Sequence, residues 1–529
     1  MKNTTRTKNK RVNNFYRRGN TSRTDPKILF PEIISMMIQQ TEEQISKVEF
    51  KEVGTVQQIG NGVARVSGLS QIGIDELVIF PNGVQGLTIG LNEQYIEVIL
   101  LGSEEGIFGG DVVTTNRERL TIPVGWNMLG KVINTLGISL KPDEEIEVDE
   151  YRTLDRRAPR IIDRAPVNAP LHTGLRVVDA LFPIGKGQRE LIIGDRQTGK
   201  TSMAIDTILN QRGNNVQCIY VSIGQKISDV INTINILRTY KALDYTTIIV
   251  ASPDDPPALR YLAPYAGCTI AEFFLDNNQD SLIIYDDLSK HAQTYREISL
   301  LLRRPPGREA YPGDIFYLHS RLLERACKLN PQMGGGSITA LPIIVLEEGN
   351  ISGYIPTNLI SICDGQIVFD KELFNRDIKP AINIGLSISR VGNAAQIPAM
   401  RNLSSDLRLE LTQYSEVEKF ARFGTEVDKS TKEQIERGRR LQEILNQQIH
   451  QPMPIEHQVL LLLAANTGFF EDIEIINIVT ESQSLISYLI QEYTELVQKL
   501  QETQEIDDSL KTEFIVAFES YKQKENTNE

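Results

Sequence analysis

Residues 194–201 of this chain are Gly194-Asp195-Arg196-Gln197-Thr198-Gly199-Lys200-Thr201, which match the pattern G-x-x-x-x-G-K-[ST] of phosphate-binding loops (P-loops). The apolar residues 191–193 before them predict a strand, and residues 202–210 after them predict a helix. A strand, this loop and a helix together bind phosphate, because backbone N–H groups and the helix dipole face the anion. A fortuitous glycine-rich turn is the alternative, and the flanking elements argue against it.

The P-loop predicts ATP or ADP with Mg²⁺ as the ligand. Lys200 would reach the β- and γ-phosphates as a positive charge, and the hydroxyl of Thr201 would bind the metal. A second element supports this prediction: residues 282–285 predict an apolar strand, and Asp286 and Asp287 follow it. An Asp after such a strand holds the magnesium shell in P-loop proteins, and Asp286 is the better candidate because it follows directly. A helix cap is the alternative role for an Asp here.

The 529 residues are too many for one hydrophobic core, so about two to four domains are expected. Residues 116–400 alternate apolar strand candidates with helical stretches. This alternation predicts an α/β domain around the P-loop, with a mostly parallel sheet covered by helices. The strand candidates are Leu191–Ile193, Cys218–Val221, Thr246–Ala251, Leu282–Tyr285, Ile338–Val345 and Gln366–Phe369.

Residues 28–115 have a different pattern. A short helix is predicted over residues 32–48, and after it short β-branched runs alternate with turn residues. Many short, closely spaced strands predict a small antiparallel β-barrel. The strand candidates are Gly62–Val66, Glu76–Phe80, Val84–Ile89, Tyr95–Leu101 and Asp111–Thr115.

Residues 401–529 carry few strand signals and predict an α-helical domain, with charged residues on the polar faces of its helices. The expected helices cover residues 402–421, 431–449, 456–465, 481–503 and 508–524. No apolar run in the chain approaches the roughly 20 residues that a membrane helix needs. We therefore expect no direct membrane span.

Charge is distributed unevenly along the chain. The first 24 residues hold eight Lys or Arg and no acid, whereas the whole chain has a formal net charge of −13. Residues 1–27 are expected to form a basic tail, either a disordered arm or an organelle transit peptide. The acidic remainder argues against nucleic acid as a partner, because phosphate contacts need a basic surface. The four cysteines lie far apart and fit reduced thiols, and the five histidines have no metal-ligand spacing.

Several further motifs resemble those of the alpha subunits of F-type ATP synthases. They run in that family's order, strongly over about residues 50–450 and loosely over the C-terminal helices, and do not cover about the first 25 residues. The resemblance implies a β-barrel, then a RecA-like P-loop domain, then a helical bundle, the order that the residue patterns predict. The motifs are Val178-Asp179-Ala180, Pro183–Glu190, the P-loop itself, Tyr285–Lys290, Ser299–Ala326, Pro380–Asn383 and Ser387–Gly392.

The resemblance also implies partners. In the family, three alpha and three beta subunits alternate in a ring around a gamma-type central stalk, and peripheral stalk subunits would contact the N-terminal region. Only the beta-side sites turn over, and there a Glu positions and activates the attacking water. Gln225 stands at that position here. An amide is not a general base, so we expect a non-catalytic, nucleotide-binding alpha subunit, although some GTPases orient water with Gln.

Arg390 is, by resemblance, an arginine finger that acts in trans. Its guanidinium would reach the γ-phosphate in a neighbouring beta subunit and stabilise the charge that develops on it. An ordinary interface salt bridge is the alternative. Ser387 and Ser389 carry the family motif and are expected to shape the loop that aims Arg390.

The resemblance implies a base pocket formed by Lys379, Pro380, Gln447 and Gln448. The family usually has Arg at the first of these positions and a second Gln where this chain has Ile449. Gln448 is the candidate replacement for that second Gln. These departures suggest a divergent branch of the family.

The implied function is synthesis of ATP from ADP and phosphate with a transmembrane ion gradient. The expected location is the cytoplasmic face of a bacterial plasma membrane, with the matrix side of a mitochondrial inner membrane as the alternative. A self-sufficient hexameric ATPase, such as a secretion or flagellar export motor, would need a catalytic Glu where Gln225 stands. A Rho-type helicase would need a basic, aromatic surface. A module that has lost nucleotide binding conflicts with the intact P-loop.

Overall fold

The computed structural model describes residues 52–422 and 429–528. The basic tail and the predicted helix over residues 32–48 lie outside the described residues. Residues 52–529 form one compact unit. Because this unit is not divided further, the domain boundaries near residues 115 and 400 stay predictions.

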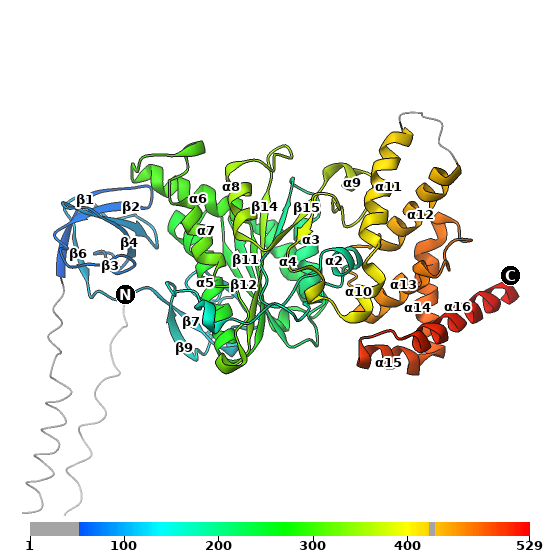
Figure 1. Cartoon of the computed structure of the whole chain (residues 1–529). Coiled ribbons are helices and arrows are strands. Elements are labelled where there is room, and N and C mark those ends of the chain that lie inside the picture. The colour runs from blue at the N-terminus through cyan, green and yellow to red at the C-terminus, as the bar shows by residue number, and fades with distance from the viewer. Residues whose placement is uncertain (1–51, 423–428, 529) are drawn as a thin grey trace, which may run out of the picture. The chain divides into compact units, whose positions relative to one another are not determined.

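The first part of the described chain is a six-stranded antiparallel barrel (blue in Figure 1) with the strand order β1-β2-β5-β4-β3-β6. The predicted barrel is therefore confirmed, and the five strand candidates correspond to β2–β6. The sequence pattern missed β1 because only Gly54 and Val56 of that strand are buried. The strands are β1 (Glu52–Gly60), β2 (Val63–Ser67), β3 (Leu77–Ile79), β4 (Gln85–Leu91), β5 (Ile96–Leu100) and β6 (Val112–Thr115).

The centre of the unit is an eight-stranded sheet with the order β16-β15-β10-β14-β13-β11-β12-β8. All neighbouring strands are parallel except β15 and β16, so the mostly parallel sheet is confirmed. The six strand candidates correspond to β10–β15. The strands are β8 (Val132–Asn134), β10 (Glu190–Gly194), β11 (Val216–Ile223), β12 (Thr246–Ala251), β13 (Asp280–Asp286), β14 (Ser337–Val345), β15 (Gly365–Phe369) and β16 (Ile388–Ser389). A separate two-stranded ribbon pairs β7 (Thr121–Val124) with β9 (Glu150–Thr153).

Both faces of the central sheet are covered by helices (Figure 1), which is why its strands are continuous apolar runs. Ile192 of β10 belongs to one buried cluster, with residues of α3 and α4. Its neighbours Leu191 and Ile193 belong to a second cluster, with residues of α5–α8. The covering helices are α3 (Lys200–Leu209), α4 (Ile227–Thr239), α5 (Pro257–Asp276), α6 (Leu288–Leu301), α7 (Ile315–Leu323) and α8 (Tyr354–Ile362).

The remaining described helices are α2 and α9–α16, and the predicted helical C-terminal domain is confirmed. Two of the helices predicted for this domain were wrong, because each is divided into two helices in the structure. Residues 402–421 belong to α10 and α11, separated by a turn at residues 405–406, and residues 481–503 are interrupted at Tyr493, whose φ of −123° is not helical. The helices are α2 (Arg176–Leu181), α9 (Lys371–Asn375), α10 (Pro398–Ser404), α11 (Leu407–Arg422), α12 (Lys429–Leu445), α13 (Ile455–Asn466), α14 (Ile478–Glu492), α15 (Thr494–Thr503) and α16 (Asp508–Asn528).

A third predicted helix, over residues 431–449, ends too late. Helix α12 stops at Leu445 because the next residues bond to other elements. The Gln447 N–H donates to Lys379 O at 2.7 Å, and its side-chain amide donates to Gly174 O at 2.8 Å. These tertiary hydrogen bonds replace the intrahelical ones, and no amphipathic pattern could have predicted them.

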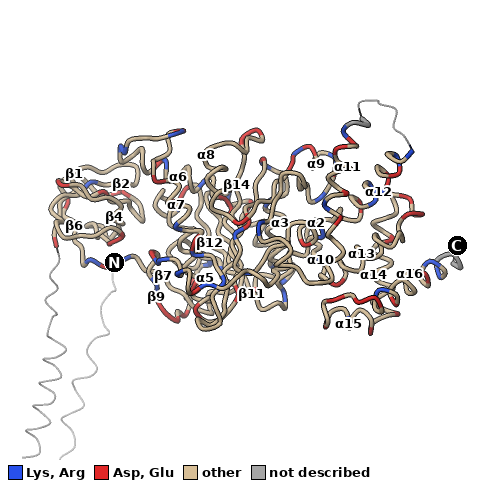
Figure 2. The backbone as a smooth tube through the Cα atoms, in the orientation of Figure 1, with Lys and Arg blue, Asp and Glu red and all other residues tan. Residues whose placement is uncertain are grey.

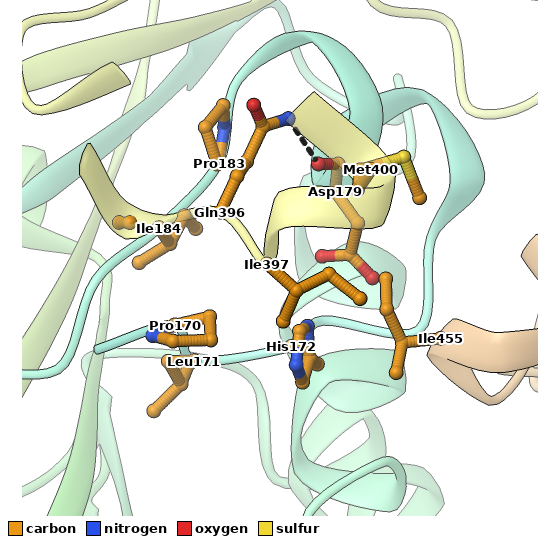
Figure 3. Close-up of a pocket in the computed structure, with 11 residues that line it drawn as sticks. Pro170, Leu171, His172, Asp179, Pro183, Ile184, Gln396, Ile397, Met400 and Ile455 are labelled. Atoms are coloured by element: carbon orange, nitrogen blue, oxygen red, sulfur yellow. Dashed lines mark hydrogen bonds between the residues drawn. The ribbon is translucent and has the colours of Figure 1, made fainter. Parts of the chain in front are cut away.

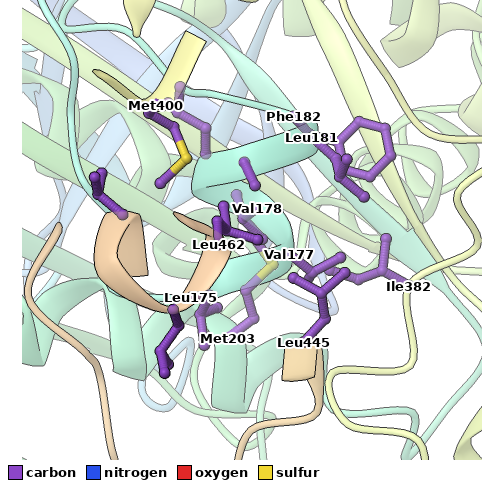
Figure 4. Close-up of a cluster of buried hydrophobic side chains, with 14 of the residues drawn as sticks. Leu175, Val177, Val178, Leu181, Phe182, Met203, Ile382, Met400, Leu445 and Leu462 are labelled. Atoms are coloured by element: carbon purple, nitrogen blue, oxygen red, sulfur yellow. The ribbon is translucent and has the colours of Figure 1, made fainter. Parts of the chain in front are cut away.

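Helix α2 joins the sheet domain to the C-terminal helices. Every residue of α2 is buried, and Figure 4 shows its apolar side chains together with Met203 of α3, Met400 of α10 and Leu462 of α13. Where α2 meets the segment before α10, the Gln396 side chain donates to the carbonyl groups of Asp179 and Ala180 at 3.0 and 2.9 Å. These residues lie beside a small pocket (Figure 3). The helical domain is thus built onto the same core as the P-loop helix.

Charged residues of both signs are spread along the described chain (Figure 2). In residues 52–422 and 429–528, every helix is too short or too polar to cross a lipid bilayer. Within these same ranges, one ion pair is fully buried: the guanidinium of Arg325 donates to both carboxylate oxygens of Glu272 at 2.8 and 2.7 Å. Both side chains are 1% exposed. This pair connects α5 to the segment after α7.

Substituting Glu272→Ala should lower the free energy of unfolding by about 3–5 kcal/mol, because it leaves the Arg325 guanidinium buried without its anion. The matched control is Glu410→Ala, which removes the partner of Arg437 in a solvent-exposed pair at 3.0 Å and should cost less than about 1 kcal/mol. Chemical denaturation of both variants measures the difference. Equal destabilisation would contradict the assignment of Arg325–Glu272 as a buried pair.

Candidate functional site

The P-loop connects the C-terminal end of β10 to the N-terminus of α3, as predicted. Gly194 is required because a side chain there would lie 2.7 Å from the Cβ atom of Phe369. Gly199 has a φ of +98°, which L side chains rarely adopt. The Asp195 carboxylate accepts a hydrogen bond from Gly349 N at 2.8 Å, which connects the P-loop to the segment after β14. The side chains of Arg196 and Gln197 are exposed.

Lys200 lies inside this loop. Its Nζ donates to Asp195 O and lies 3.4 Å from Thr198 Oγ1, which itself donates to Asp195 O at 2.9 Å. Burial lowers the pKa of Lys200 to about 8, although Asp286, Asp287 and Asp195 oppose this shift. The ammonium therefore lies within the loop that the sequence pattern predicts to bind phosphate.

Asp286, at the end of β13, gathers three donors from three elements. Its Oδ2 accepts from Thr201 Oγ1 at 2.8 Å and from Tyr220 OH at 2.7 Å, and its Oδ1 accepts from Gln225 Nε2 at 2.8 Å. The structure thus brings together Thr201 and Asp286, the two predicted metal residues. A hydroxyl beside a carboxylate fits Mg²⁺, which prefers oxygen ligands and retains water in its shell.

Both the nitrogen and the oxygen of the Gln225 side-chain amide form hydrogen bonds. Its Nε2 faces Asp286 and also lies 3.3 Å from Asp287 Oδ2, while its Oε1 accepts from Lys290 Nζ at 2.8 Å. Asp287 also caps α6 by accepting from Lys290 N at 2.7 Å. Burial and the Asp286 charge raise the pKa of Asp287 to about 6. The amide therefore faces two carboxyl groups.

Arg390 follows β16 directly. Its backbone N–H donates to Asp364 O at 2.9 Å, and its exposed guanidinium donates to Ile360 O at 3.3 Å. The hydroxyl groups of Ser387 and Ser389 both bond to backbone carbonyl groups, and their role in aiming Arg390 stays a prediction. The Ser387 hydroxyl donates to Asn383 O at 2.6 Å, and the Ser389 hydroxyl donates to Pro183 O at 2.9 Å.

Arg390 and the P-loop lie at opposite ends of β10. In the sheet, Glu190 pairs with Gly365, which pairs with Ser389, whereas Gly194 pairs with Phe369. Four residues of strand separate the two rows, or about 13 Å. The structure therefore does not bring Arg390 to the phosphate loop of its own chain.

Comparison with known proteins identifies the family. The sequence model of the ATP synthase alpha/beta family, nucleotide-binding domain, matches residues 174–389, and that of the ATP synthase alpha/beta chain, C terminal domain, matches residues 396–521. ATP synthase subunit alpha of Aquifex aeolicus is 48% identical over 94% of this chain and 99% of its own length. The corresponding subunit of Clostridium acetobutylicum is 49% identical over 93% and 97%.

The chain belongs to the ATP synthase subunit alpha family. It is therefore an ATP synthase subunit, and its central domain is a nucleotide-binding domain. The resemblance noted in the sequence is confirmed, and so is the order of barrel, nucleotide domain and helical domain. A third relative, ATP synthase subunit alpha of Petrotoga mobilis, is 48% identical over 93% of this chain and 98% of its own length.

Lys379 and Gln447, two of the predicted base-pocket residues, are joined by a hydrogen bond at the junction with the helical domain. Lys379 N donates to Asn446 Oδ1 at 3.1 Å, just before Pro380. The buried Gln447 amide accepts from Arg176 N and donates to Gly174 O, so it bonds within the protein and positions this segment. Gln448 is exposed, and its side chain accepts from Gln451 at 3.2 Å. Direct contacts of these residues with a base stay predictions.

Two residues that bond to the predicted site residues were missed from the sequence. Tyr220 bonds to Asp286 and Lys290 bonds to Gln225, yet each lies on an element whose position only the sheet order determines. Next to the predicted base-pocket residues, the backbone N–H and Nδ1 of His450 lie 2.9 and 3.1 Å from Asp206 Oδ1 on the P-loop helix.

Affinity for Mg-ATP should fall as the pH rises through 8. The Lys200 ammonium attracts the phosphates, and burial lowers its pKa to about 8, so the charge is present below that pH and is lost above it. Affinity should be nearly constant between pH 7 and 7.5 and decline by at most about tenfold per pH unit above 8. Calorimetric titration measures this profile. A Lys200→Met variant should bind weakly without the decline; the same decline in that variant would refute the assignment.

Proposed function

We propose that this chain is the non-catalytic, nucleotide-binding alpha subunit of an F-type ATP synthase, which makes ATP from ADP and phosphate with a transmembrane ion gradient. It binds ATP or ADP with Mg²⁺ at its own P-loop and donates Arg390 to the catalytic site of a neighbouring beta subunit. The observation that carries the proposal is the amide of Gln225, which faces Asp286 and Asp287 where, by the family resemblance, a catalytic subunit would have a Glu.

Gln225 cannot act as the base that activates water. An amide has no proton-accepting group in the useful pH range, and its orientation is fixed because Lys290 Nζ, a pure donor, requires the carbonyl oxygen on its side. A Glu at this position would bring a third carboxyl group against Asp286 and Asp287. These residues therefore favour binding of the nucleotide without its hydrolysis.

Nucleotide binding rests on three residues. The Lys200 ammonium would contact the β- and γ-phosphates, the Thr201 hydroxyl would bind Mg²⁺ directly, and the Asp286 carboxylate would hold its shell. When bound, Mg²⁺ neutralises phosphate charge. Thr201 Oγ1 and Asp286 Oδ2 lie 2.8 Å apart, so the protein itself orients the two oxygens that would hold the metal.

Arg390 has the properties of a finger for another subunit. It lies at the end of β10 opposite the P-loop, its guanidinium is exposed, and within the described residues it makes no ion pair. Its loop is held by Ser387 and Ser389. A guanidinium that is presented without an internal anion is suited to the charge on a transferring phosphoryl group.

The partners follow from this role. We propose beta subunits that alternate with this chain in a ring, a gamma-type central stalk, and peripheral stalk subunits at the N-terminal region. The chain would lie peripherally on the energy-transducing membrane, at the cytoplasmic face of a bacterial plasma membrane, with the mitochondrial matrix side as the alternative. A self-sufficient hexameric ATPase is disfavoured by Gln225.

Arg390→Ala should abolish ATP hydrolysis by the chain assembled with beta and gamma subunits, lowering kcat by about 10³–10⁵-fold, because the finger stabilises only the transition state. Nucleotide affinity at the P-loop of this chain should not change. The control is Arg437→Ala, which removes an exposed arginine of the helical domain. Steady-state hydrolysis and nucleotide titration measure both effects; a variant that keeps its kcat would eliminate Arg390 as the finger.

A further inference from the structure

Glu190 is a fully buried acid that the proposed function does not use. It begins β10, immediately before the apolar residues that lead to the P-loop. Its Oε2 accepts from Gln188 Nε2 at 2.7 Å, and its Oε1 has no hydrogen-bond partner. A buried, half-satisfied carboxyl group is costly, so its presence at the start of a central strand calls for a functional reason.

The sheet register places Glu190 beside the Arg390 loop. Glu190, Gly365 and Ser389 form one row across β10, β15 and β16. Neighbouring residues in such a row point to the same face of the sheet, with strands about 4.8 Å apart. A side chain at Gly365 would collide with both Glu190 carboxyl oxygens and with Ile388 O. Glycine in the middle of the row therefore leaves room for the Glu190 carboxyl group.

Gln188 links the side chains of Glu190 and Ser389. Its Oε1 accepts from Gly185 N at 2.7 Å, which fixes the orientation of the amide. Its Nε2 can then donate two hydrogen bonds, one to Glu190 Oε2 and one to Ser389 Oγ at 3.3 Å. Ser389 Oγ also accepts from Gly392 N at 3.3 Å, so the link includes both residues that flank Arg390 and Val391.

We propose that Glu190 and Gln188 form the support that positions the Arg390 loop, so that its guanidinium meets the nucleotide of a neighbouring subunit. This inference rests on the proposed function of Arg390. Glu190 is a positioning residue, because it acts through Gln188 and Ser389 and touches no substrate.

The charge state of Glu190 matters to this role. Burial raises the pKa of Glu190 well above its usual range; Asp364 raises it further, whereas the Gln188 hydrogen bond and the Arg390 charge lower it. A neutral carboxyl group still accepts from Gln188 through Oε2. A neutral Glu190 also leaves the Arg390 guanidinium without an anionic partner. An ionised Glu190 would attract that guanidinium and compete with the phosphate.

The test compares variants in the complex assembled with beta and gamma subunits. Glu190→Ala should lower kcat for ATP hydrolysis by about ten- to a hundredfold, the size expected from a small misplacement of a catalytic group, with little change in KM. Glu190→Gln should restore most of the activity, because its amide accepts the Gln188 hydrogen bond and carries no charge. In the Arg390→Ala background, Glu190→Ala should cause no further loss in single-turnover hydrolysis.

The inference is overturned if Glu190→Ala keeps its kcat, if Glu190→Gln is as impaired as Glu190→Ala, or if the losses of Glu190→Ala and Arg390→Ala multiply. Should Glu190→Ala fail to assemble, Ser389→Ala removes the other end of the link without emptying the core, and it should lower kcat in the same way; an unchanged kcat would again overturn the inference. A kcat that survives Arg390→Ala would instead refute the proposed function itself.

Discussion

The site depends on one interaction: the Asp286 carboxylate at the end of β13, buried and bonded to Thr201, Tyr220 and Gln225. A buried carboxylate must be surrounded by donors, and here the donors come from the P-loop helix, from β11 and from the loop after it. One acid therefore fixes the distance between the phosphate loop and Gln225. It also prepares the pair of oxygens that would hold a metal.

The two ends of one strand of the central sheet separate the P-loop from the Arg390 loop. The C-terminal end of β10 carries the P-loop of this chain, and its N-terminal end lies in the row that holds Ser389 and the loop of Arg390. About 13 Å of strand lies between these two ends. This separation is what the proposed role of Arg390 in a neighbouring subunit requires.

Much of this could be predicted from the sequence because the signals are local. Consecutive residues are enough to predict the P-loop, the strand that ends in Asp286 and the continuous apolar strands. The two-residue β16 and three-residue β8 are too short for any periodicity. Tyr220 and Lys290 become site residues only through strand order. The Gln447 side-chain amide donates to Gly174 O and its backbone N–H donates to Lys379 O, both on distant segments, and these contacts end α12 four residues before the predicted end.

The most direct test of the account is the fate of ATP bound to the isolated chain. Labelled Mg-ATP would be bound in stoichiometric amount, and the nucleotide would be recovered after denaturation at intervals of minutes to hours. We expect tight binding and recovery of intact ATP, because Gln225 supplies no base and no neighbour supplies a finger. Conversion of the bound ATP to ADP within minutes would contradict it and would make this chain a catalytic subunit in its own right.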